Sequence, residues 1–290
     1  MSQRPGAIVL TIVVVLALAA GLAAAGGSAG GTLGGIPLFV LAVVAAFAIQ
    51  IVAYIPAVLL RTEKFFDLTG GLTFAVVAVA LLVASPAGVR GWVLAAMIVI
   101  WGVRLSAFLF IRVRAQGSDG RFDDIKGNPL AFLRVWLMQG LWVAVTSSAA
   151  WVGITALDRR GFDAWVVVGA VVWLAGLLLE IVADAQKAAF RRDPAHWGRF
   201  IDTGVWSWSR HPNYLGEILV WIGVAIVALP AATGWQWVTV ISPVFVVLLL
   251  TRVSGIPLLE KRADERWGDE PAYREYKART PVLVPGIGRG

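Results

Sequence analysis

Cysteine is absent from this 290-residue chain, and histidine occurs only twice. Disulfide bonds, thiolate catalysis and cysteine-ligated metals are therefore excluded, and two histidines leave little room for a histidine-built metal site. Charge is scarce as well, because 15% of the residues are charged, whereas soluble domains average about 25%. We accordingly expect no metal centre and no ordinary soluble domain.

Apolar residues dominate what is present. They make up 59% of the chain, and the mean hydropathy is +0.78, which indicates an integral membrane protein. The net charge of +7 does not indicate nucleic acid, because lysine and arginine in a membrane protein first report topology and contact with anionic headgroups. No soluble basic domain is recognisable, so we expect no nucleic-acid partner.

Eight stretches are long enough to cross a bilayer, which takes roughly 20 mostly apolar residues. The sequence therefore predicts an all-α, polytopic membrane helical bundle with about eight transmembrane helices and an amphipathic C-terminal tail. The first stretch also fits a cleaved secretory signal, which would leave seven spans. Residues 20–35, rich in Gly and Ala, are interpreted as a loose outer connection. The predicted spans are about 7–25, 36–60, 71–86, 91–111, 132–155, 164–186, 214–231 and 236–256.

The cations indicate how these spans are oriented. With a cytoplasmic N-terminus, the outer loops hold only three of the 25 Lys and Arg residues, namely Arg90, Arg159 and Arg160, and Arg104 lies within a span. The other 21 fall on the inner side, so the positive-inside rule places both termini in the cytoplasm. The longest inner segments are 112–131, 187–213 and 257–290. A ligand from water should therefore bind on the cytoplasmic side.

Two carboxylates stand out in the sixth span. Glu180 and Asp184 are four residues apart on one helix face, and Arg191 returns to that face. Carboxylates this close to the hydrocarbon are costly, which favours a functional role facing protein or a watery cavity. An ion pair between Asp184 and an interfacial belt of Lys187, Arg191 and Arg192 is the alternative. Both interpretations stay open from the sequence.

A polar cluster, SRHPNY at 209–214, directly precedes the seventh span. Pro212 suits the first position of a helix, and a helix N-terminus can hold an anion such as phosphate. Asn213 and Glu217 follow one turn apart, where they could receive a carboxamide or a ribose. The alternative is an interfacial cap flanked by belt aromatics, namely Trp206, Trp208 and Tyr214.

The basic tail carries the third constellation. Paired tyrosines and arginines suit adenine stacking and bidentate binding of a phosphate, although a polybasic helix can also lie on anionic headgroups without any ligand. The tail residues concerned are Arg252, Glu260, Arg262, Tyr273, Tyr276 and Arg279.

Two segments carry a family resemblance. SRHPNYLGEILVWIG, followed after one span by SGIPLLEKRADERWGDEPAYREYKARTPVLVP, resembles the C-terminal domain of the steroid 5-alpha-reductase family, and most of all a bacterial branch known mainly as a domain of unknown function. The likeness is specific over about 180–285 and looser over 67–139. It implies a membrane oxidoreductase, placed in a bacterial inner membrane, that uses cytosolic NADPH to reduce a carbon-carbon double bond conjugated to a carbonyl in a lipid or steroid-like substrate.

The resemblance also implies a division of labour. Residues 1–60 would be N-terminal transmembrane helices, 61–160 the substrate side and 161–290 the cofactor-binding domain. Asp67 would be the catalytic acid, with Tyr54 beside it, and Trp101 and Arg104 would bind substrate. Trp101 stands where the family has a tyrosine, and an indole can donate a hydrogen bond but is no proton source. The cofactor residues implied are Asp184, Arg191, His211, Asn213, Tyr214, Glu217, Arg252, Glu260, Tyr273 and Tyr276.

One rival comes from another enzyme class. Membrane methyltransferases acting on isoprenylcysteine or phospholipid amines share an R-H-P-x-Y element and a tail with a glutamate, two tyrosines and a proline, and they bind S-adenosylmethionine there. Asn213 directly after His-Pro, and the pair Gly216-Glu217, favour the reductase. A transporter or scaffold predicts Gly/Pro-broken helices in paired halves, and no such symmetry is seen.

Overall fold

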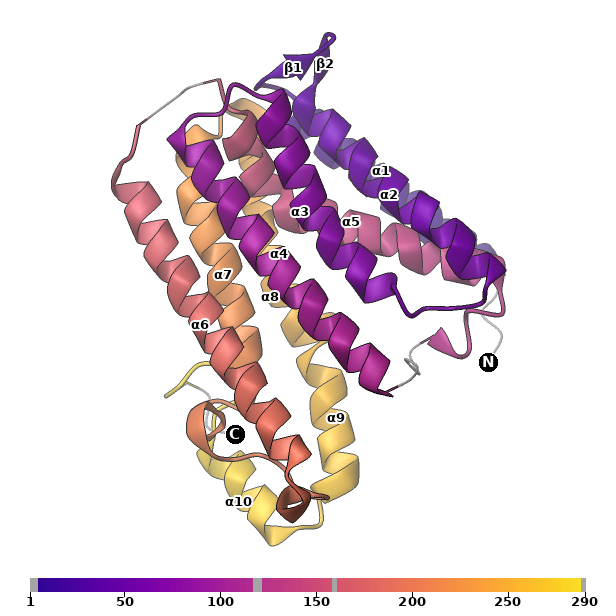
Figure 1. Ribbon diagram of the computed structural model, residues 1–290, viewed down its shortest axis with the longest axis vertical. Coiled ribbons are helices and arrows are strands. Elements are labelled where there is room, and N and C mark those ends of the chain that lie inside the picture. The colour runs from indigo at the N-terminus through magenta and orange to yellow at the C-terminus, as the bar shows by residue number, and fades with distance from the viewer. Residues whose placement is uncertain (1–4, 117–121, 158–160, 288–290) are drawn as a thin grey trace. The chain divides into compact units, whose positions relative to one another are not determined.

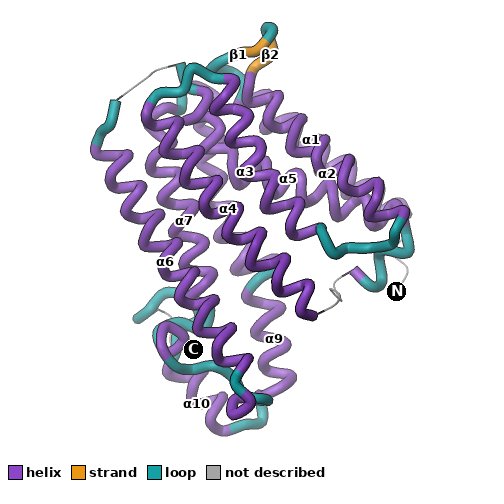
Figure 2. Tube along the Cα trace, in the orientation of Figure 1, coloured by secondary structure: helices purple, strands orange, loops and turns teal. Residues whose placement is uncertain are grey.

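The computed structural model describes residues 5–116, 122–157 and 161–287. Figure 2 shows that these residues are helical almost throughout. Eight helices of the described chain are long and apolar enough to cross a membrane, which confirms the predicted all-α, polytopic membrane helical bundle. Five of the cations counted for topology lie outside the described residues, namely Arg4, Arg121, Arg159, Arg160 and Arg289.

The helices follow one another along the chain (Figure 1), and a longer segment, 193–211, joins α6 to α7. Short 3-10 turns cover Pro194–His196, Gly204–Ser207, Leu229–Ala231 and Gly234–Val240, and a π turn covers Leu249–Val253. The α-helices are α1 Pro5–Gly26, α2 Leu38–Leu59, α3 Phe66–Ala84, α4 Val89–Gln116, α5 Pro129–Thr155, α6 Ala164–Arg192, α7 Pro212–Ala228, α8 Ile241–Leu248, α9 Ile256–Trp267 and α10 Pro271–Arg279.

Several helices extend beyond the apolar stretches that predicted them. Helix α5 begins at Pro129, because the Asn128 side chain caps it by accepting from the backbone N–H of Leu130 at 3.1 Å and of Ala131 at 3.2 Å. Helix α6 ends at Arg192 instead of 186, since long basic side chains are tolerated at the last turn. Helix α7 begins at Pro212, as predicted.

The stretch 20–35 is not a loose connection, and that prediction is wrong. Helix α1 continues to Gly26, and two short antiparallel strands follow, β1 Thr32–Leu33 and β2 Ile36–Pro37. The turn between them needs positive φ at both central residues, which Gly34 (57°) and Gly35 (82°) supply. Glycine here makes a defined hairpin instead of a flexible linker.

The described chain forms two compact units. Unit 1 comprises Met1–Val167 and Val224–Ser242, and unit 2 comprises Val168–Gly223 and Pro243–Gly290. Within unit 1, α5 packs against α1 and α2, and α3 packs along α4. The division by role at residues 60 and 160 concerns function and stays a prediction.

In unit 2, glycines bring the backbones of α6 and α7 into direct contact. A Cβ atom on Gly176 would lie 2.6 Å from the carbonyl oxygen of Gly216, and one on Gly223 would lie 2.6 Å from that of Gly169. Such close approach is typical of small residues at transmembrane helix interfaces. The C-terminal end of α6 and the N-terminal end of α7 are the polar ends of this pair. They lie beside the segment 193–211 and the tail helices.

Candidate functional site

Trp206, in the turn Gly204–Ser207, fixes the segment after α6. Its indole N–H donates to the carbonyl of Ala183 at 3.1 Å, and the ammonium of Lys187 lies 4.4 Å from its ring centroid, within cation–π range. The side-chain oxygen of Gln186 accepts from the backbone N–H of Val205 at 3.0 Å. The segment is thereby held against α6.

Helix α10 is tied to the same segment. The hydroxyl of Tyr276 donates to the carbonyl of Trp206 at 2.8 Å, and the ring of Phe200 lies 5.2 Å from that of Tyr273 and 5.4 Å from that of Tyr276. Both tyrosines are buried, and burial, the main cause, raises the pKa of each phenol. The two phenols therefore stay neutral at physiological pH.

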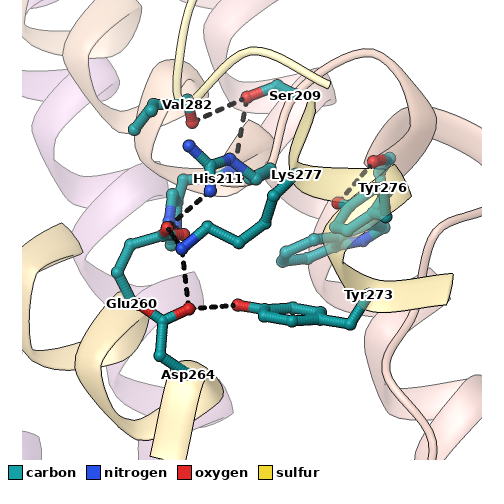
Figure 3. A network of polar contacts seen from close by, with 10 residues as sticks. Ser209, His211, Glu260, Asp264, Tyr273, Tyr276, Lys277 and Val282 are labelled. Carbon is teal, nitrogen blue, oxygen red and sulfur yellow. Dashed lines mark hydrogen bonds and ion pairs between the residues drawn. The ribbon is translucent and has the colours of Figure 1, made fainter. Parts of the chain in front are cut away.

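The carboxylate of Glu260, on α9, joins the polar cluster before α7 to the tail (Figure 3). One oxygen lies 2.9 Å from Nε2 of His211, and the other accepts from Nη1 of Arg210 at 2.6 Å. The ammonium of Lys277 lies 3.4 Å from that second oxygen. Burial lowers the pKa of His211, outweighing the opposite effect of Glu260. A neutral imidazole then donates from Nε2 to Glu260.

A second carboxylate completes the network on the tail side. Oδ1 of Asp264 accepts from the phenol of Tyr273 at 3.2 Å and from the ammonium of Lys277 at 2.6 Å, as Figure 3 shows. Lys277 thus bridges Asp264 and Glu260, one helical turn apart on α9. This links α9 and α10 through charge-assisted contacts.

Two cavities open around this network. The first, here the α6 cavity, measures about 330 Å³ and the second, here the α10 cavity, about 420 Å³. The α10 cavity is lined by Arg210, Asp264, Gly268, Tyr273, Arg274, Lys277 and Ala278. The α6 cavity has aromatic walls formed by Phe190, Phe200, Trp206, Trp267, Tyr273 and Tyr276. Its charged lining consists of Lys187, Arg191, Arg199, Arg210, Arg262, Arg266 and the single carboxylate Glu260.

The structure brings five of the predicted cofactor residues together. These five line the α6 cavity: Arg191, His211, Glu260, Tyr273 and Tyr276.

The other five predicted cofactor residues lie outside the lining of both described cavities. Asp184 is buried on α6, next to the Ala183 carbonyl that accepts from Trp206. Asn213, Tyr214 and Glu217 are half-buried in the first two turns of α7, and Arg252 is exposed in the π turn Leu249–Val253. Their proposed roles remain predictions.

The predicted catalytic and substrate residues all belong to unit 1. Asp67 is half-buried in the first turn of α3. The phenol of Tyr54 on α2 donates to the carbonyl of Pro129 at 3.0 Å, and its ring packs on an aromatic cluster that includes Phe66, the neighbour of Asp67. Tyr54 therefore contacts this cluster, and Asp67 directly follows one of its members along the chain.

The predicted substrate residues lie on α4. Trp101 is fully buried, with its ring edge-to-face against Phe74 at 5.3 Å. Arg104 lies about one turn further along and is half-buried. This packing gives Trp101 a place in the core of unit 1, and a substrate role for it remains a prediction.

Arg210 and its pairing with Glu260 were not predicted as parts of a site. The local signal was present, because Arg210 directly precedes His211 in the motif, but the partner lies 50 residues away along the chain. Lys187, Trp206 and Lys277 were likewise missed as contributors. Among the residues that the structure describes, no group of three or more His, Asp or Glu side chains is placed to hold a metal ion.

Comparison with known proteins gives one family and one relative. The model of the family described as "Protein of unknown function (DUF1295)" matches residues 53–280. Uncharacterized protein C594.04c of the fission yeast Schizosaccharomyces pombe is 26% identical over 177 residues, which cover 54% of this chain and 49% of the relative. The chain thus spans about half the length of the curated relative it matches. No solved structure shows a significant match.

Proposed function

The chain belongs to the DUF1295 family, and we propose that it is a membrane oxidoreductase that uses NADPH to reduce a carbon-carbon double bond conjugated to a carbonyl in a lipid or steroid-like substrate. The resemblance of its C-terminal motifs to the steroid 5-alpha-reductase family supports this assignment. The proposed setting is a bacterial inner membrane with both termini in the cytoplasm, which the distribution of cations favours.

The charge of the α6 cavity is the observation that carries the proposal. Six basic side chains and one carboxylate line it, so the cavity suits a ligand with several negative charges. NADPH has three phosphate groups, which arginines bind well because of their forked, charge-assisted donors. Its rings can stack on aromatic side chains such as Phe200 and Tyr276.

The same charge distinguishes the two candidate cofactors. S-adenosylmethionine has a positively charged sulfonium and no phosphate, so an excess of cations disfavours it. The pairing of His211 with Glu260 does not distinguish the two cofactors, because it would connect the polar motif to the tail with either one bound. The methyltransferase therefore ranks second.

The residues of the chain fit NADPH and have separable roles. Bound NADPH would supply a hydride to the double bond. Arg191 and the other basic side chains of the α6 cavity would hold phosphate. Glu260 would keep Arg210 and His211 in place. Asp67 would provide the proton that completes the reduction, with Tyr54 beside it. Trp101 and Arg104 would contact the lipid.

Calorimetric titration of the purified protein in lipid nanodiscs tests the assignment. We expect NADPH to bind and S-adenosylmethionine not to bind. Arg191→Ala should weaken NADPH binding about tenfold or more, because a charge-assisted hydrogen bond is lost, and Asn213→Ala should also weaken it. Arg192→Ala serves as the control, since Arg192 is exposed on the same helix and lies outside both cavities. Uptake of S-adenosylmethionine without NADPH would refute the proposal.

A further inference from the structure

The two cavities of unit 2 adjoin one another. Arg210 and Tyr273 line both of them, so these two side chains form the boundary. Ligand cavities usually measure about 300 to 1,000 Å³, and each cavity alone, at about 330 and 420 Å³, falls in the lower half of that range. Neither by itself is large for a dinucleotide, whereas the two together are suited to one.

Arg210 has a donor that the protein does not use. Its side chain is 7% exposed, and its Nη1 donates to Glu260 at 2.6 Å. Its Nε is buried and has no hydrogen-bond partner in the described chain. A buried charged donor without a partner costs stability, so a ligand that accepts a hydrogen bond at this point would remove that cost.

The other cations of the α10 cavity are already engaged. Arg274 donates from Nε to the carbonyl of Gly268 at 3.0 Å and from Nη2 to that of Asp269 at 2.7 Å. Lys277 donates to Asp264 at 2.6 Å. Arg210 therefore differs from both, because its side chain lines both cavities and its buried Nε has no partner in the described chain.

We propose that Arg210 binds the diphosphate bridge of the dinucleotide, with one nucleoside half in the α6 cavity and the other in the α10 cavity. This rests on the proposed function and extends it, because it adds the α10 cavity and Arg210 to the cofactor site. A diphosphate offers acceptor oxygens midway along a two-part ligand, and it matches a cationic donor placed between two cavities.

Arg210→Lys is the variant that tests this role. Lysine keeps the positive charge, but its single nitrogen cannot occupy the positions of both Nη1 and Nε. If that nitrogen keeps the contact with Glu260, the donor to the diphosphate is lost. Arg192→Lys is the matched control, since it makes the same exchange in the same unit at an exposed residue outside both cavities.

The measurement is calorimetric binding of NADPH and of adenosine 2′-monophosphate, which has no diphosphate, to protein in nanodiscs. We expect Arg210→Lys to weaken NADPH binding about tenfold or more and to leave binding of the monophosphate within about twofold, which also shows that the variant is folded. Arg192→Lys should change neither. Unchanged NADPH affinity in Arg210→Lys, or an equal loss for both ligands, would overturn the inference. Wild-type protein that binds no NADPH would instead refute the proposed function.

Discussion

At Glu260, a single carboxylate meets three basic side chains from two segments of the chain, Arg210 and His211 before α7 and Lys277 on α10. Their distances to its oxygens range from 2.6 to 3.4 Å. Arg210 and His211 are buried, so removing the carboxylate would leave buried donors without a partner, which is more costly than losing an exposed ion pair. Glu260 is thus a structural centre of the proposed cofactor site as well as part of its lining.

His211 makes stability depend on pH in a predictable direction. Burial, with help from Lys187 and Arg210 and against Glu260, lowers the pKa of His211 below its usual 6.5. The folded protein therefore favours neutral His211, and this contribution to stability is present above about pH 6.5 and lost as the pH falls through the folded-state pKa. We expect the melting temperature to fall between pH 7.5 and 5.5 by more in the wild type than in His211→Gln.

His196→Gln is the control for this experiment. His196 is the other histidine of the chain, and it stacks on Phe190 at 4.2 Å. This variant should keep the wild-type dependence of the melting temperature on pH. A His211→Gln protein with the wild-type pH dependence would show that another group is responsible.

Asp67 is the residue on which the proposed chemistry depends most. If it donates the proton, Asp67→Asn should lower kcat by about a hundredfold or more and leave the Kd for NADPH within about twofold. Single-turnover kinetics and titration with NADPH separate these two effects. Asp123→Asn, an exposed carboxylate that pairs with Lys126, should leave both unchanged. Parallel losses in kcat and NADPH affinity would mean that Asp67 is only structural.

At the scale of elements, α6 and α7 contact each other through glycines spaced seven residues apart. A Cβ atom on Gly216 would lie 2.7 Å from the carbonyl oxygen of Gly176 and 2.7 Å from the backbone nitrogen of Glu180. Neither atom is the end of a flexible side chain that could move aside. Helices α6 and α7 lead directly to the proposed cofactor site, so their spacing determines where its residues lie.

Gly216→Leu should therefore separate the two helices. We expect a loss of about 1 to 3 kcal/mol in the free energy of unfolding, as in overpacked cores, seen as a lower melting temperature and weaker NADPH binding. Gly21→Leu is the control, because Gly21 also lies in a helix but a Cβ atom added there would meet no other atom within 4 Å. A fully stable Gly216→Leu protein would contradict the close helix contact.

At the scale of the whole molecule, the predicted orientation in the membrane rests on the distribution of arginines and lysines. The absence of native cysteine allows single-cysteine labelling without background. We expect a membrane-impermeant maleimide to label Trp235→Cys in intact spheroplasts and to label Asp269→Cys only after permeabilisation. Both positions are exposed. The reverse pattern would place the proposed cofactor site on the outer face.

Hydropathy and local capping determine most of the helices of this protein and several of their bounds. Each span results from about 20 neighbouring residues, so the eight helices and the start of α7 at Pro212 were predictable. Helix bounds were predicted incorrectly where polar caps such as Asn128 extend a helix. The hairpin at Gly34 and Gly35 was not predicted, because glycine suits both flexible and tightly turned backbone.

The site could be predicted only in part, because its contacts join distant segments. The motif at 209–214 and the tail were both identified, and five of ten expected cofactor residues share the α6 cavity. The contact of Glu260 with His211 spans 49 residues and that of Tyr276 with Trp206 spans 70. A sequence pattern reports on residues within a few helical turns of one another. Membrane class and helix positions therefore follow from local composition, whereas the residues that share a cavity are determined only by how the helices pack.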